Sequence, residues 1–204
     1  MSHPRGRRTA IKELKLQQYA QVQYHQPSYY EIPVVVISRE PPLEKLSAEQ
    51  YMSAAAVCTR FITHYFRRTT SDFVVTHEGA LPLQSWIANF FALTQMRLYI
   101  IAGTLVMLNR FRACSRKMPQ DTAGFEVFFV ASQLSHKFIE ESSFGAKSWS
   151  QAVQSAIAPA RIVQLEIHAL KVLQWRVALE LKELKEIGRL KFGISFKFRN
   201  EGFM

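Results

Sequence analysis

Apolar residues recur at helical spacing along most of the chain beyond about residue 45, and this pattern predicts an all-α fold. One stretch, Phe125–Glu141 (FEVFFVASQLSHKFIEE), is rich in apolar residues and contains neither Pro nor Gly. Its apolar positions follow one face of a helix: Val127, Val130, Ala131, Leu134 and Phe138. Further aromatic residues widen this face, and a helix that is apolar over most of its circumference belongs in the middle of a folded domain. We therefore expect the rest of the fold to be organised around this helix.

The same periodicity predicts helices on both sides of the central one. They are Ala48–Phe66, Gln84–Gln95, Arg97–Ser115, Ser148–Ile157 and Ala160–Trp175. Ser47 is the expected N-cap of the first helix, with Gln50 at the position that completes a capping box. Either Asp121 or Thr122 is expected to cap the central helix, and Pro159 to occupy the first turn of the last one.

The segments between and around these helices carry weaker signals. Arg67–Pro82 is polar and contains Gly and Pro, so we interpret it as a linker. Ile32–Ser38 (IPVVVIS) has high β propensity but is flanked by prolines, which favours an isolated extended segment. The tail from Leu181 begins as a helix, which Gly188 and Gly193 are expected to break.

These observations divide the chain into four parts. They are a basic, partly disordered arm (1–45), an N-terminal helix with its linker (46–80), a helical domain (81–180) and a C-terminal tail (181–204). We expect both termini to be flexible.

The formal net charge of +10 is spread along the chain. Residues 81–180 carry ten basic and six acidic side chains, a net +4, and the only dense basic cluster lies in the N-terminal arm. Spread charge fits a solvated surface, weak nucleic-acid affinity or an acidic protein partner. There is no apolar leader, and the longest apolar run, Leu98–Leu108, is much shorter than the ~20 residues of a membrane span. We therefore expect an intracellular protein of the nucleus or cytoplasm, with no membrane partner.

No pattern of catalytic, metal-binding or cofactor-binding residues is present. The sequence lacks a phosphate-binding glycine loop and the motifs of zinc and serine hydrolases. His136 and His168 are expected to be hydrogen-bonded structural residues, and Glu140 with Glu141 to be a solvated pair at a helix end. The sequence therefore predicts no enzyme, no cofactor and no metal.

Two charges in the apolar helices require an explanation. Lys137 stands near the end of the central helix, and Glu166 stands between two apolar residues of the last one. A charge in such a position usually needs a partner. If the two helices pack side by side, Lys137 and Glu166 meet at the rim of the domain and offer a donor and an acceptor to an outside molecule. The alternative is that they are two unrelated surface charges.

The order of these helices and their motifs resembles the cyclin box. In cyclins the third box helix ends in Ala-Ser-Lys, an aromatic or aliphatic residue, any one residue and then an acidic one. This chain matches that pattern with Ser135, Lys137, Phe138 and Glu140, although His136 separates the serine from the lysine. The fifth helix pattern is matched by Glu166, Leu170, Leu173, Trp175 and Val177. LVMLNRF is similar to the family's Tyr-Leu-Asp-Arg signature, with Met107, Leu108, Asn109 and Arg110. The resemblance covers residues 80–180 and is greatest to the fungal Pcl-like cyclins.

The resemblance implies a single five-helix box and a role for specific residues. In cyclins the Lys–Glu pair anchors the contact with a cyclin-dependent protein kinase, so a kinase-binding role is implied for Lys137 and Glu166. Phe138, Ile139, Val172 and Leu173 would be its apolar neighbours. The chain departs from the family at Asn109, which replaces an aspartate, and in a tail too short for a second box.

The implied function is that of a non-catalytic subunit that binds and activates a cyclin-dependent protein kinase. One alternative is a cyclin-fold transcription factor that contacts nucleic acid, which the charge permits but the net +4 of residues 81–180 does not favour. Nothing in the sequence interleaves aromatic and basic residues as a groove-binding surface would. Another alternative is a degenerate cyclin that acts only as a scaffold, to which Asn109 and the short tail point.

Overall fold

The computed structural model describes residues 46–114, 119, 121–140 and 143–193, apart from the side chain of Arg68. This part of the chain is mostly helical, which confirms the all-α prediction. Its helices are α2 (Ala48–Tyr65), α3 (Leu83–Leu93), α4 (Leu98–Ala113), α5 (Gly124–Ile139), α6 (Ala146–Ala152), α7 (Pro159–Val172) and α8 (Leu181–Ile187). The N-terminal arm, with Ile32–Ser38, lies outside the described residues.

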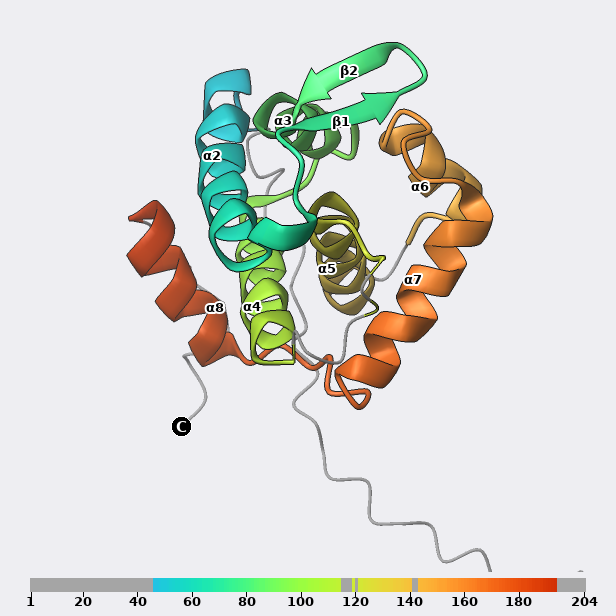
Figure 1. Ribbon diagram of the computed structural model, residues 1–204. Helices are drawn as coiled ribbons and strands as arrows, with labels where there is room; N and C mark the ends of the chain where they lie inside the picture. The colour runs from blue at the N-terminus through green and yellow to red at the C-terminus, as the bar shows by residue number, and fades with distance from the viewer. Residues whose placement is uncertain (1–45, 115–118, 120, 141–142, 194–204) are drawn as a thin grey trace, which may run out of the picture. The chain divides into compact units, whose positions relative to one another are not determined.

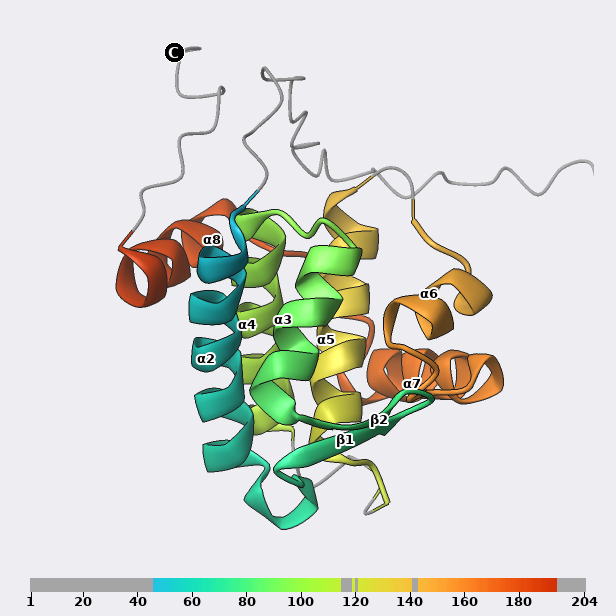
Figure 2. The ribbon, with the colours of Figure 1, turned by 90° about the horizontal axis from the view of Figure 1, so that it is seen from above.

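Helix α5 is the buried centre of this unit, as its sequence predicts. It lies between α4 and α7 and also contacts α2 (Figures 1 and 2). Its side chains are buried over three full turns from Glu126 to His136. Gly103 of α4 permits close packing, because a Cβ at that position would lie 2.9 Å from Cδ1 of Leu179 and 3.3 Å from the Cβ of Ser135 on α5.

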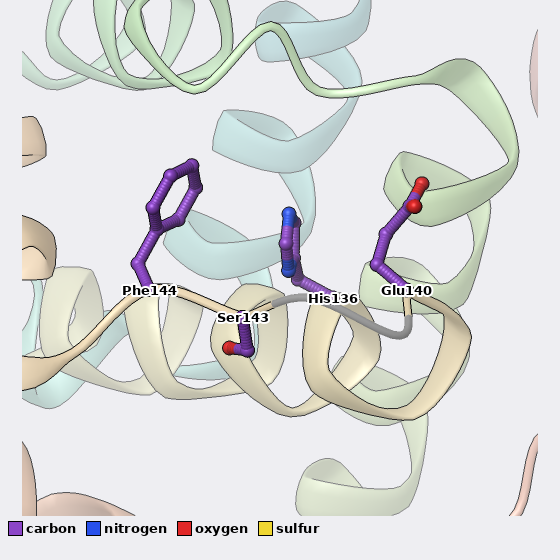
Figure 3. Close-up of a pocket in the computed structure, with 4 residues that line it drawn as sticks. All are labelled: His136, Glu140, Ser143 and Phe144. Atoms are coloured by element: carbon purple, nitrogen blue, oxygen red, sulfur yellow. The ribbon is translucent and has the colours of Figure 1, made fainter.

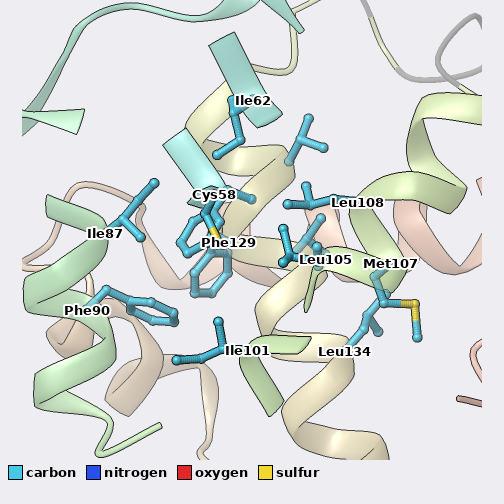
Figure 4. Packing of buried hydrophobic residues seen from close by; sticks show 14 of the residues in the cluster. Cys58, Ile62, Ile87, Phe90, Ile101, Leu105, Met107, Leu108, Phe129 and Leu134 are labelled. Carbon is cyan, nitrogen blue, oxygen red and sulfur yellow. The ribbon is translucent and has the colours of Figure 1, made fainter. Parts of the chain in front are cut away.

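Aromatic and aliphatic side chains from several helices form one continuous core around α5. Cys58 and Ile62 enter it from α2, Phe90 from α3, and Leu105 from α4 (Figure 4). Phe129 of α5 meets them and is fully buried. Since α2 contributes to the same core as α3, α4 and α5, the described residues from 46 onward pack as one body.

The helix starts follow local hydrogen bonding. Ser47 and Gln50 form the predicted capping box, with N···O distances of 3.2 and 2.7 Å. Pro159 opens α7 as expected. The start of α5 differs from the prediction, because Ala123 is the N-cap and not Asp121 or Thr122. The Glu126 carboxylate reaches back and accepts the Ala123 N–H at 3.0 Å, which ties the N-cap residue to the first turn without a capping side chain.

The polar stretch Arg67–Pro82, which the sequence predicts to be a linker, contains a β-hairpin instead. The linker interpretation is therefore wrong. A short 3₁₀ turn, η1 (Arg67–Thr69), leads into strands β1 (Phe73–Thr76) and β2 (Gly79–Pro82), which pair antiparallel. Val74 and Thr76 point inward and are buried, whereas the alternate residues are exposed. Gly79 has φ 128° in the tight turn, a conformation that favours glycine.

The ends of the C-terminal helices also differ from the sequence prediction. Helix α7 stops at Val172 because Gln174 and Trp175 adopt left-handed backbone conformations, with φ 52° and 62°. Gly188 does not break α8, since its φ and ψ are helical and the chain continues as a π-helical turn, η3 (Gly188–Phe192). The turn ends at Gly193, where φ is 66°.

Candidate docking site

Lys137 of α5 and Glu166 of α7 form an ion pair where the two helices pack together. The lysine Nζ lies 2.6 Å from Oε1 and 2.7 Å from Oε2 of Glu166. One turn earlier on α5, the buried Gln133 donates its amide Nε2 to Glu166 Oε2 at 3.3 Å. The prediction that the two charges meet is therefore confirmed, and the alternative of two unrelated surface charges is wrong.

The ion pair lies at the rim of the domain and keeps part of its polar surface open. The Lys137 side chain is 34 % exposed and that of Glu166 is 23 % exposed. A partly exposed pair adds at most about 1 kcal/mol to folding stability. A lysine ammonium has three donors and a carboxylate has several acceptor positions, so both groups retain hydrogen-bonding capacity toward an outside molecule.

Exposed apolar side chains surround the ion pair on α7. Val163, Glu166, Ile167 and Leu170 share one face of the helix by their spacing. Val163 and Ile167 are each 47 % exposed, and Phe138, next to Lys137 on α5, is 43 % exposed. The opposite face of α7 is buried in the core and consists of Ile162, Leu165, Ala169 and Val172. We call Lys137, Phe138, Val163, Glu166 and Ile167 the α5–α7 surface.

The structure changes the apolar part of the predicted site. Val172 and Leu173 are 7 % and 5 % exposed, so they pack in the core and offer a partner almost no surface. Ile139 is half-buried against the core. Val163 and Ile167 take the place of Val172 and Leu173 at the surface. The sequence does show two apolar faces on this helix, but periodicity alone does not say which of them the core covers.

A small pocket of about 160 Å³ lies beside the C-terminal end of α5. His136, Glu140, Ser143 and Phe144 line it, and the side chains of His136, Glu140 and Phe144 rise to the same side of the chain (Figure 3). The His136 ring lies 5.3 Å from the ring of Phe144 and 5.3 Å, edge-on, from that of Trp149. These aromatic rings cover part of the imidazole, which also lines the pocket.

Both histidines and Glu140 differ from the sequence expectation. Nδ1 of His136 is buried with no hydrogen-bond partner among the described residues, and burial lowers its pKa. His168 is exposed. Glu140 is half-buried and accepts a hydrogen bond of 2.9 Å from the Tyr99 hydroxyl, so it is not a solvated carboxylate. Glu141 lies outside the described residues.

Arg110 has a structural role that sequence reasoning missed. Its guanidinium donates to the carbonyls of Arg176 and Ala178 at 3.1 and 2.9 Å, and to the Glu183 carboxylate at 2.7 Å. Asn109 beside it is exposed. The arginine therefore ties α4 to the segment that leads into α8, a contact between residues more than sixty positions apart that no local pattern reveals.

Comparisons with known proteins add no identification. The chain matches no model of a known protein family, no curated protein and no solved structure. None of the helices in the described ranges is both long and apolar enough to cross a membrane. Within the same ranges, no three His, Cys, Asp or Glu side chains are grouped as metal ligands would be.

Proposed function

We propose that this chain is a cyclin-like regulatory subunit that binds and activates a cyclin-dependent protein kinase through the α5–α7 surface. The observation that carries the proposal is the Lys137–Glu166 ion pair at the rim of the domain. It joins the two residues to which the cyclin resemblance assigns the kinase contact, and exposed apolar side chains surround it.

The order of the helices supports this proposal. Five helices, α3 to α7, lie between residues 81 and 180, where the sequence resembles a cyclin box. The short α6 with its buried Trp149 lies between the two long helices that carry the ion pair. Helix α2 precedes this set as the additional N-terminal helix.

The energetics of the surface favour a docking role over a purely structural one. The ion pair adds little to folding stability because it is partly exposed. Val163 and Ile167 leave about half of their apolar surface in contact with water, which is less favourable than a polar side chain would be at the same position. Large apolar side chains around a desolvatable charge pair are typical of the centre of a protein interface. The charges would set orientation, and the apolar contacts would supply binding free energy.

The chain would activate the kinase by binding one of its conformations better than the other. Contact with the α5–α7 surface would hold the regulatory helix of the kinase inward, where its glutamate pairs with the lysine of the ATP site. The kinase supplies every catalytic group. The subunit supplies only the difference in binding free energy between the two conformations.

The test is the affinity of the purified chain for a panel of purified cyclin-dependent kinases, measured together with kinase activity. We expect Lys137→Glu and Glu166→Lys each to weaken binding by about 2–5 kcal/mol, as for close charge pairs at interfaces. The double exchange Lys137→Glu/Glu166→Lys restores the internal ion pair with reversed polarity. It should keep the wild-type melting temperature and still fail to bind, because the partner meets the wrong charge at each position.

Two further variants separate the apolar contact from a general effect of surface charge. Ile167→Asp should abolish binding, because it places an acid within the apolar part of the α5–α7 surface. Val75→Asp is the matched control, since Val75 is 74 % exposed on the hairpin, and it should bind like the wild type. Equal affinity of the wild type and the double exchange would refute this docking site. Binding without activation would favour the scaffold alternative.

A further inference from the structure

One face of α2 is basic along its last two turns. Arg60, Thr63, His64 and Arg67 line an open groove, and their spacing of three, four and seven residues places them on one side of the helix and of the 3₁₀ turn η1 that follows it. Arg60, His64 and Arg67 are exposed. Seven residues at the helical rise of about 1.5 Å separate the two arginine backbones by about 10 Å.

Helix α4 adds a fourth basic group to the same end of α2. The guanidinium carbon of Arg112 lies 4.8 Å from the centre of the Tyr65 ring, in a cation–π contact. Tyr65 in turn packs on Phe61, with ring centres 4.7 Å apart. Aromatic and basic side chains thus alternate here, an arrangement that the sequence does not reveal because Tyr65 and Arg112 are far apart in the chain. We call Arg60, His64 and Arg67 the α2 basic face, and Arg112 lies to one side of it, over Tyr65.

No carboxylate neutralises this face in the described part of the chain. The one acidic residue of α2 is Glu49, in the first turn at the other end of the helix, and α4 has no acidic residue. Arg60, Arg67 and Arg112 make no ion pair with any described residue. The arginines with structural roles differ, since all of them pair with carboxylates: Arg97, Arg110 and Arg161.

We infer that the α2 basic face binds a phosphorylated peptide segment of a partner protein. Arginine forks match the tetrahedral oxygens of a phosphate, and clusters of arginine are a recurring means of recognising phosphorylated peptides. A peptide in the polyproline conformation advances about 3.1 Å per residue with three residues per turn. Two phosphoserines three residues apart therefore lie on one side of such a peptide, about 9 Å apart, which approximates the separation of Arg60 and Arg67.

The surroundings of Tyr65 favour a peptide over a single-stranded nucleic acid. Sequence-independent binding of single strands relies on aromatic faces that are open for stacking with bases. Arg112 lies over the Tyr65 ring, and Phe61 and His64 also pack against it, so the aromatic side chain already has partners of its own. The α2 basic face therefore presents positive charge to solvent, and the aromatic rings beside it hold basic side chains in position.

This inference does not depend on the proposed function. In both views α2, which carries the α2 basic face, and α7 lie on opposite sides of α4 and α5 (Figures 1 and 2). A phosphorylated segment would therefore bind whether or not a kinase occupies α5 and α7, and a substrate or a regulator would be an equally suitable source of it.

The experiment is fluorescence anisotropy with the full chain and a labelled ten-residue Gly/Ala/Pro peptide that contains two phosphoserines three residues apart. We expect binding that weakens as salt is raised, at least tenfold tighter than to the same peptide with unmodified serines. Arg60→Ala/Arg67→Ala should weaken binding at least tenfold. Arg112→Ala should weaken it several-fold, because it removes one positive group beside the face and leaves Arg60 and Arg67.

The control is Lys147→Ala/Lys171→Ala, which removes the same charge from exposed positions on α6 and α7. It should change affinity less than twofold. An equal loss in the two double variants would overturn the inference, because binding would then follow net charge alone. So would equal affinity for the phosphorylated and unmodified peptides. Tighter binding of a 20-nucleotide oligothymidine, lost in Arg60→Ala/Arg67→Ala, would reassign the face to nucleic acid.

Discussion

Two polar residues of α5, Gln133 and His136, are buried immediately beside the exposed Lys137. Gln133 donates to Glu166, but its carbonyl oxygen Oε1 is buried without a partner among the described residues. His136 has one ring nitrogen in the same situation. Buried polar atoms of this kind cost about 1–3 kcal/mol each when they lack a hydrogen bond. The C-terminal end of α5, which carries the candidate site, therefore contributes less to folding stability than an apolar sequence would.

The buried imidazole of His136 should make folding stability depend on pH. Burial lowers its pKa below the value of about 6.5 of an unfolded chain, and the Glu140 carboxylate offsets this only in part. Above that value both states are neutral and stability is unaffected. As the pH falls through it, the unfolded state takes up a proton that the native state does not, so the free energy of unfolding decreases until the pH passes the native pKa.

Urea denaturation at pH 7.5 and pH 5.5 tests this expectation. His136→Phe, which suits the aromatic surroundings of the ring, should lose less stability between the two pH values than the wild type does. His168→Phe is the matched control, because His168 is exposed, and it should keep the wild-type dependence. If acid destabilises the wild type and His136→Phe equally, His136 is not the group that titrates.

At the scale of elements, the sequence predicts the helices, because their apolar residues recur with helical periodicity. It does not predict the features that form through contacts between residues distant in the chain. Apolar periodicity predicts helices α2 to α7, but α7 ends earlier than its periodicity suggests, since Gln174 and Trp175 take left-handed conformations. The hairpin was missed because Val74 is the one fully buried apolar residue of β1, too little for an alternating pattern. Lys137 and Glu166 were predictable as charges in apolar helices, whereas the place of Arg112 beside the α2 basic face depends on packing between distant residues.

The attachment of α8 to the rest of the unit depends on Arg110. Arg110→Ala removes three hydrogen bonds to the segment that enters α8, including the one to Glu183. Because these groups are partly exposed, we expect a local cost of about 1–2 kcal/mol, or roughly tenfold faster amide hydrogen exchange in α8. Arg110→Lys should give an intermediate rate, since an ammonium does not reproduce the geometry of the guanidinium.

Hydrogen exchange followed by mass spectrometry reports α8 separately from the core. Arg112→Ala is the control, because it removes the same charge two positions further along α4, where the guanidinium lies over the Tyr65 ring. Its α8 amides should exchange at the wild-type rate. Unchanged exchange in Arg110→Ala would mean that the apolar contacts of Leu184 hold α8 without the arginine.

At the scale of the whole described unit, both candidate surfaces depend on one aromatic cluster in the core. The Phe90 ring of α3 lies about 6 Å, centre to centre, from five other aromatic rings: Trp86 and Phe91 of α3, Phe128 and Phe129 of α5, and Trp149 of α6. It is 1 % exposed. Helices α5 and α6 lead directly to the α5–α7 surface, and α3 packs on α2. The aromatic cluster therefore joins the helices on which both surfaces rest.

Phe90→Ala should therefore destabilise the unit as a whole. Removing a buried phenylalanine costs about 3–5 kcal/mol, a large part of the 5–15 kcal/mol that typically stabilises a domain. Phe73→Ala is the matched control, since Phe73 is 56 % exposed on β1, and it should cost less than about 0.5 kcal/mol. Guanidinium unfolding followed by both far-ultraviolet circular dichroism and tryptophan fluorescence measures the two costs. Coincident transitions in the two signals are expected for Phe90→Ala, because Trp86 and Trp149 lie in the cluster that the substitution weakens, and separate transitions would show that α3 and α6 unfold independently.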